Sequence, residues 1–140
     1  MSGPNYGLDK GYNLLNSGAA QSIYRFMKFA STENSVLQCA AVTDKPIGVC
    51  QQRVEAVDSA TNNVQVDVRL FGISKVESGA ANAGVIAIMS FVGTDAVGCA
   101  QVAVATQFAM GVALQASSAA GQWIDVLILP YLRSTAMGTA

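Results

Sequence analysis

The chain has 140 residues, enough for one domain with a hydrophobic core. Hydrophobic residues make up 51% of it and charged residues 12%, about half the usual charged share of a soluble domain, and the formal net charge is −1. This balance excludes the basic stripe with which a nucleic-acid-binding protein neutralises phosphates. The chain has no histidine, so the commonest general base of enzymes is missing.

The first segment, residues 1–20 (MSGPNYGLDKGYNLLNSGAA), has neither helical nor strand periodicity. It lacks the charged start and apolar core of a signal peptide. Its glycines, asparagines and serines surround spaced apolar side chains, so we expect an extended N-terminal arm that adds to a neighbouring protein. The residues expected to make that contact are Tyr6, Leu8, Tyr12, Leu14 and Leu15.

Short strands separated by turns are expected after the arm. The segments are 23–29 (IYRFMKF), 35–42 (SVLQCAAV), 47–52 (IGVCQQ), 64–70 (VQVDVRL), 84–93 (GVIAIMSFVG), 98–106 (GCAQVAVAT) and 122–130 (QWIDVLILP). In 64–70 the valines and Leu70 alternate with polar residues, which predicts a half-buried strand. Segment 84–93 reads as a strand buried on both faces. A helix is the alternative for 98–106, and residues 113–121 suit one short helical turn.

These elements predict an all-β protein, a compact barrel, a tulip-like barrel or a sandwich. We assign residues 1–20 to the arm, 21–130 to the β-rich domain and 131–140 to a C-terminal tail. One apolar run, residues 96–114, resembles a membrane span in length, but Gln101, Thr106 and Gln107 interrupt it. We therefore expect no membrane segment.

Between Ser78 and Trp123 the chain carries a single charged residue, Asp95. Charge is the usual device that keeps a protein surface soluble, and this part of the chain contains several turns, which lie on surfaces. We therefore expect other protein to cover this region. Val85, Ile88 and Phe91 represent the expected contact between subunits.

Residues for catalysis or metal binding do not gather in the sequence. Cys39, Cys50 and Cys99 are far apart, form no C-x-x-C pair and read as small buried side chains, so neither a metal site nor a cofactor is expected. Asp67 and Asp125 occupy matching places in two similar stretches of sequence, which suggests a paired-carboxylate site. We favour the alternative that both side chains face solvent or a neighbouring protein. A sugar-binding surface would draw on the aromatic residues Tyr6, Tyr12, Tyr24 and Trp123. We expect no enzyme.

One unit of sequence occurs twice. KPIGVCQQRVEAVDSATNNVQVDVRLFG, residues 45–72, and FAMGVALQASSAAGQWIDVLIL, residues 108–129, share a Gly-Val pair, a Gln and a strand built around Asp. The alignment places Asp67 on Asp125, and it places Val66, Val68 and Leu70 on Ile124, Val126 and Ile128. Duplication, convergence and chance all remain open as its origin.

The PIGV step, the VQVDVRLFG strand and the MGVALQASSAAG segment before WIDVLIL resemble the small capsid decoration, or cement, proteins of tailed bacteriophages, over residues 23–129. The resemblance implies a barrel or tulip-shaped domain on the outer surface of the virion head, made in the host cytoplasm. It also implies homo-oligomers, trimers above all, that staple neighbouring major capsid proteins. The alternatives are another virion subunit, such as a tail tube or head fibre, and a carbohydrate-binding module.

Overall fold

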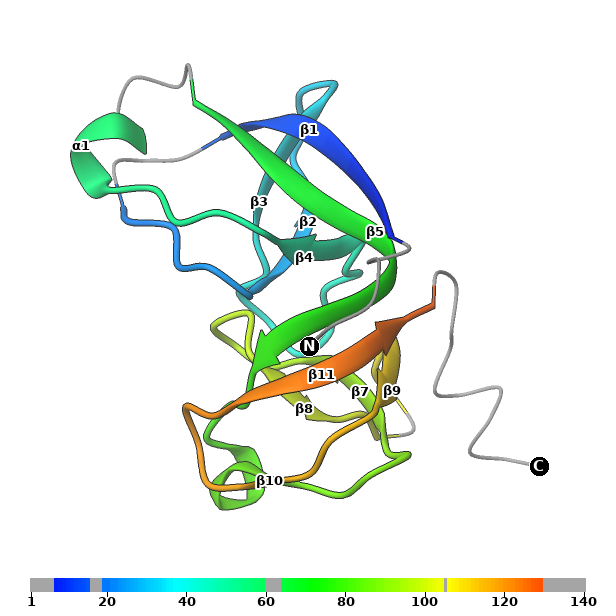
Figure 1. Cartoon of the computed structure of the whole chain (residues 1–140). Helices are drawn as coiled ribbons and strands as arrows, with labels where there is room; N and C mark the ends of the chain where they lie inside the picture. The colour runs from blue at the N-terminus through cyan, green and yellow to red at the C-terminus, as the bar shows by residue number, and fades with distance from the viewer. Residues whose placement is uncertain (1–6, 16–18, 60–63, 105, 130–140) are drawn as a thin grey trace, which may run out of the picture.

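The computed structural model describes residues 7–15, 19–59, 64–104 and 106–129 and is almost entirely β (Figure 1). Within these residues the strands are β1 (Leu8–Leu14), β2 (Phe26–Phe29), β3 (Ser35–Gln38), β4 (Gly48–Cys50), β5 (Gln65–Glu77), β6 (Val85–Ile86), β7 (Phe91–Thr94), β8 (Ala100–Val102), β9 (Gly111–Ala113), β10 (Ser117–Ser118) and β11 (Trp123–Ile128). A short helix, α1 (Ala56–Ser59), and a 3₁₀ turn (Ala81–Gly84) complete them. The all-β prediction is confirmed.

The strands form two rings that share β5, the long green strand of Figure 1. In the first, the order β1-β3-β2-β4-β5 closes on itself because β1 also pairs with β5, which makes a five-stranded barrel. In the second, β5 is followed by β11, β9, β7 and β8. A parallel bridge between Ser78 and Ala100 links its ends. We call these rings the first and second barrels.

The predicted repeat is confirmed, because its two copies occupy equivalent places in the two barrels. Val49 of β4 pairs with Arg69, two residues after Asp67, and Val112 of β9 pairs with Leu127, two residues after Asp125. The equivalence extends beyond the sequence match: β2 and β3 of the first barrel correspond to β7 and β8 of the second. The second half of β5 takes the place in the second barrel that β1 takes in the first.

Matching hydrogen bonds hold the two copies in the same register. The side-chain oxygen of Gln52 accepts the backbone N–H of Asp67 at 2.8 Å, and that of Gln115 accepts the N–H of Asp125 at 2.9 Å. The backbone N–H of Gln51 donates to Asp67, and that of Leu114 donates to Asp125. The Gln that follows each Gly-Val pair therefore stabilises the Asp-bearing strand beside it.

The buried apolar residues form two clusters: one lies within the first barrel, and the other fills the second barrel and also includes Phe26, Cys39 and Val49 from the first. The matched buried pairs are Met27 with Val92, Val36 with Ala100, Cys50 with Ala113, Val66 with Ile124, and Val68 with Val126. Strand β5 contributes to both cores, because its alternation of inward and outward residues continues over thirteen residues. Its first half buries Val66 and Val68 in one core, and its second half buries Val76 in the other.

The structure differs from the expected arm. Residues 8–14 form β1, which pairs with β3 and β5, so they belong to the first barrel and not to a segment outside the domain. Tyr12 is 5% exposed and Leu14 is 1% exposed, so both are core residues of this chain. The boundary expected at residue 20 is therefore wrong for this strand. Tyr6 and residues 131–140 lie outside the described residues.

Two other local expectations are wrong. Segment 84–93 is not one buried strand: β6 ends at Ile86 and the chain turns before β7, which leaves Val85 and Ile88 exposed. Met89 takes a left-handed conformation in this turn, with φ 69°. Residues 113–121 hold no helical turn but the short strand β10, which pairs with β6. Within segment 98–106, in contrast, Ala100–Val102 form the strand β8, as expected.

Candidate interaction surfaces

The described residues show no assembled catalytic centre. Burial raises the pKa of the Cys39 and Cys99 thiols to about 12 and that of Cys50 to about 11, so none is a ready nucleophile at neutral pH. Asp67 lies opposite Gly11, whereas Asp125 pairs with Lys75, so the two matched carboxylates are not brought together. Within the described part of the chain, no three His, Cys, Asp or Glu side chains gather to hold a metal.

The second barrel presents an uncharged apolar surface. Val85, Ile88 and Phe91, expected at a subunit contact, are 52%, 60% and 37% exposed. Met89, 67% exposed, and Leu114 extend this surface, since the Met89 N–H donates to the carbonyl of Ala113. We call these five residues the neutral face. Large apolar side chains at such exposure are characteristic of protein contact surfaces.

The one charge between Ser78 and Trp123 does not reach this surface. Asp95 is 8% exposed, and its Oδ1 accepts the backbone N–H groups of Val97 and Cys99, at 2.8 Å each. The carboxylate therefore stabilises the turn between β7 and β8. The surface of this segment is consequently more neutral in three dimensions than the sequence alone indicates.

The residues expected in the arm separate into two groups. Leu8 and Leu15 are exposed, whereas Tyr12 and Leu14 are buried. Leu8 lies at the edge of an apolar groove of about 410 Å³. The groove is lined by Leu8, Tyr12, Phe29, Pro46, Ile47, Leu70, Phe71 and Met110. Sequence reasoning missed Phe29 and Phe71; the signal for Phe71 was its outward phase in β5.

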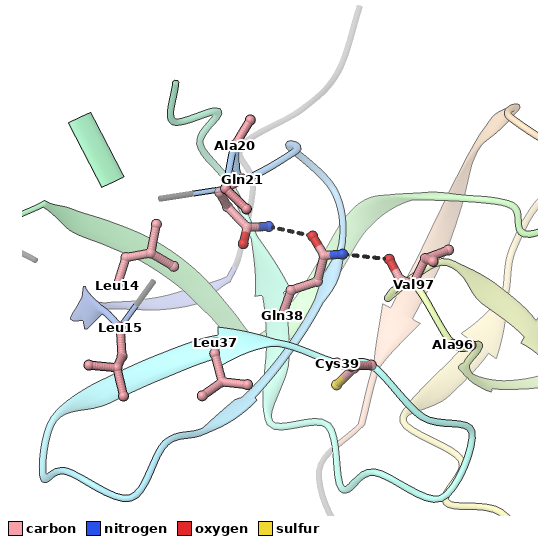
Figure 2. A pocket seen from close by; sticks show the side chains of 11 residues that line it. Leu14, Leu15, Ala20, Gln21, Leu37, Gln38, Cys39, Ala96 and Val97 are labelled. Atoms are coloured by element: carbon pink, nitrogen blue, oxygen red, sulfur yellow. Dashed lines mark hydrogen bonds between the residues drawn. The ribbon is translucent and has the colours of Figure 1, made fainter. Parts of the chain in front are cut away.

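A second hollow, of about 600 Å³, lies where the first barrel meets the 96–97 turn of the second (Figure 2). The Gln21 side-chain amide donates to Gln38 Oε1 at 3.1 Å, and the Gln38 amide donates to the carbonyl of Val97 at 2.8 Å. Arg25 Nη1 donates to the same carbonyl at 2.8 Å. These bonds tie the barrels together and favour one rigid body.

The aromatic residues suggested for a sugar surface also divide. Tyr24 and Trp123 meet edge to face, with ring centroids 5.0 Å apart. Tyr12 instead packs against Phe29, with centroids 5.8 Å apart, and Tyr6 lies outside the described residues. In the Tyr24–Trp123 pair, the Trp123 indole is 54% exposed.

Among the described residues, no helix is long and apolar enough to cross a membrane. No protein-family model matches the chain, and no curated protein matches it. Among solved structures, the chain is similar to the N base of the head fiber protein gp8.5 of bacteriophage phi29, with a TM-score of 0.62 and 15% sequence identity. The match covers 87% of this chain and 93% of that one. The two chains share a fold.

Proposed function

We propose that the protein is a structural, non-enzymatic component of a phage virion, mounted on the outer surface of the head. The observation that carries this proposal is the likeness to a head fiber base, which extends over nearly the whole of both chains. The sequence resemblance to capsid decoration proteins points to the same particle. Mounting on a head is a binding task that needs a rigid body and contact surface, and the joined barrels supply both.

Within this proposal, the neutral face makes the contact between copies of the chain, and a trimer is the favoured assembly. Ile88 and Met89 are its most exposed members. The major capsid protein is the partner on the head, with Leu8, Leu15 and Tyr6 as the remaining contact candidates. Binding through several subunits at once strengthens weak single contacts, because the second contact forms at a high effective concentration.

Two versions of this role differ in copy number. For a decoration protein that staples neighbouring capsid subunits we expect a copy number close to that of the capsid protein, and for a fibre base a smaller one. Quantitative mass spectrometry of purified particles, as copies of this chain per major capsid protein, separates them. A ratio near one or a fixed simple fraction supports decoration, and a lower fixed ratio supports a fibre base. Absence from the particles contradicts both.

The contact assignment is tested by placing a charge on the neutral face. We expect Ile88→Lys to dissociate the oligomer, because the contact between subunits would have to bury an unpaired ammonium group. Val42→Lys, at another exposed apolar position in the first barrel, is the matched control and should leave the assembly unchanged. Native mass spectrometry reads both variants. A wild-type chain that is monomeric at micromolar concentration contradicts self-association.

The role of the N-terminus is tested by a deletion that spares β1. Removal of residues 1–15 would take away β1 and open the first barrel, so lost head binding would report unfolding. Removal of residues 1–6 leaves β1 in place. We expect this shorter variant to fold and to lose affinity for heads that lack the protein; full retained affinity excludes Tyr6 from the contact.

A further inference from the structure

Trp123, the single tryptophan of the chain, lies on the outer face of β11 and is 54% exposed. Its neighbours in β11 alternate, so that Ile124 and Val126 enter the core while Trp123 and Asp125 face outward. A Trp side chain buries more apolar surface than any other when it packs, so its exposure here sacrifices stability. An aromatic ring held in this way is available to stack on a ligand.

Tyr24 supports this indole from a strained position. Its φ is 61°, in the left-handed region that residues other than glycine and asparagine seldom adopt. The backbone is held there from both sides: the Tyr24 N–H donates to Cys50 at 2.9 Å, and its carbonyl accepts the N–H of Glu77 at 3.1 Å. Strain of this kind is concentrated at binding sites. Here it fixes the phenol ring edge-on against Trp123.

Charged groups in balanced pairs border the two rings. Glu77 is the cross-strand partner of Trp123, and its Oε2 accepts two bonds from Arg25, at 3.0 and 3.2 Å. On the next rung, Lys75 Nζ lies 3.2 Å from Asp125 Oδ1. The other oxygen of each carboxylate accepts no hydrogen bond from a described residue. Acceptors and a lysine donor therefore remain available beside the indole.

We propose that Trp123, Tyr24, Glu77, Lys75 and Asp125 form a binding site for an uncharged saccharide. A pyranose ring has one apolar C–H face, which stacks on the indole, and a rim of hydroxyls, which bond to the carboxylates and to Lys75. With Arg25, which pairs with Glu77, the site and its border hold two positive and two negative side chains, so the site offers no net attraction to phosphate. In contrast to the neutral face, the surroundings of this ring are polar, which favours a hydroxyl-rich ligand over an apolar protein surface.

This inference is independent of the proposed virion role. A head component with such a site would have a second binding task, directed at carbohydrate outside the particle. Mass spectrometry of particles tests the first role and saccharide titration tests the second, so either one can fail alone.

Because the chain has one tryptophan, its fluorescence reports directly on the site. The full chain is titrated with cellotetraose, maltotetraose, tetra-N-acetylchitotetraose and a β-galactotetraose, each to millimolar concentration. We expect a saturable change in emission with at least one of them. Adenosine monophosphate, which also stacks on indoles, serves as the comparison ligand and should cause no saturable change.

Variants then locate the site by calorimetry with the saccharide that binds. We expect Trp123→Ala to weaken binding at least tenfold, Trp123→Phe to retain part of it, and Glu77→Gln to weaken it several-fold. Phe71→Ala removes an exposed aromatic ring from β5, outside the proposed site, and should leave binding unchanged. Circular dichroism confirms that each variant is folded. The proposal is overturned if no saccharide gives a saturable change, if Trp123→Ala binds like the wild type, or if adenosine monophosphate binds instead.

Discussion

The two barrels have the same backbone plan, but their surfaces differ in the number of charged residues. Strand order, register and the Gln-to-Asp hydrogen bond are reproduced from the first to the second. The first barrel carries most of the charges of the chain, whereas residues 78–129 contribute only Asp95 and Asp125. Asp95 is buried and Asp125 pairs with Lys75. Inward positions therefore specify this fold, and outward positions are free to differ between the two barrels.

The side chains that fill matched core positions also differ between the barrels. Met27 and Val36 of the first barrel correspond to the smaller Val92 and Ala100 of the second. The second core also contains Ile86, which lies outside the repeated unit, and Phe26 and Val49, which come from strands of the first barrel. Cores tolerate such exchanges as long as total volume and pattern are kept.

The largest effect is expected from cavities in either core. Met27→Ala in the first barrel and Ile124→Ala in the second should each lower the free energy of unfolding by about 3 kcal/mol. Both residues are at most 2% exposed. Because β5 belongs to both barrels, each variant should unfold in a single transition in urea. Trp123 emission and far-UV circular dichroism should coincide; separate midpoints would mean that the barrels are independent units.

A matched pair of glycines tests the equivalence of the register. A Cβ on Gly48 would lie 2.2 Å from the carbonyl oxygen of Arg69, and one on Gly111 would lie 2.3 Å from that of Leu127. We expect Gly48→Ala and Gly111→Ala to cost about 2 kcal/mol each, because a backbone has to shift. Gly11→Ala is the control, since its nearest neighbour atom would be 3.8 Å away. Chemical denaturation measures all three; a harmless Gly111→Ala would break the comparison.

A smaller effect is expected from the repeated glutamine. Gln52→Ala and Gln115→Ala each remove one side-chain acceptor for the N–H of an outward-facing Asp. The expected loss is about 1 kcal/mol in each barrel. Gln65→Ala serves as the control, because no described hydrogen bond involves its side chain. Unequal losses from the matched pair would show that the two bonds differ in strength despite their common geometry.

The smallest effect concerns acid and is expected in the first barrel alone. Partial burial acts to raise the pKa of Asp44, but hydrogen bonds from Lys28 and the N–H groups of Ala40 and Ala41 outweigh it, so the pKa is lowered. The stability from these bonds is present above the usual pKa of 3.8 and is lost as pH falls through the lower folded value. Asp44→Asn should therefore be less stable than the wild type at pH 7, and the gap should narrow at pH 2.5. Urea midpoints at both values measure it; a constant gap would contradict this assignment.

Local patterns predicted part of this molecule well. The alternation of Val66 and Val68 with polar residues marked the start of β5, and the Gly-Val, Gln and Asp spacing marked the repeat. Exposed Val85 and Ile88 agree with the expectation of a surface that lacks charge. The partners that cover this surface and the role of the N-terminal residues on a capsid stay predictions.

Other elements were hidden for identifiable reasons. Strand β1 contains Gly11 and two charged residues, so the inward phase of Tyr12 and Leu14 is inconspicuous until β3 and β5 pair with it. In segment 84–93 a run of apolar residues imitates a buried strand, yet the chain turns within it. Hydrophobicity alone does not distinguish a core strand from an exposed contact surface.

By itself, the sequence determined that the protein is all-β, that one unit is used twice, and that histidine chemistry is absent, because alternation and composition are local properties of the chain. The tertiary structure decided which strands meet. It joined the barrels through β5, buried Asp95 in the turn between β7 and β8, and brought Tyr24 to Trp123 from distant parts of the chain. A strand pattern predicts that one face is buried, but only the pairing of strands in the folded protein determines which residues that face packs against.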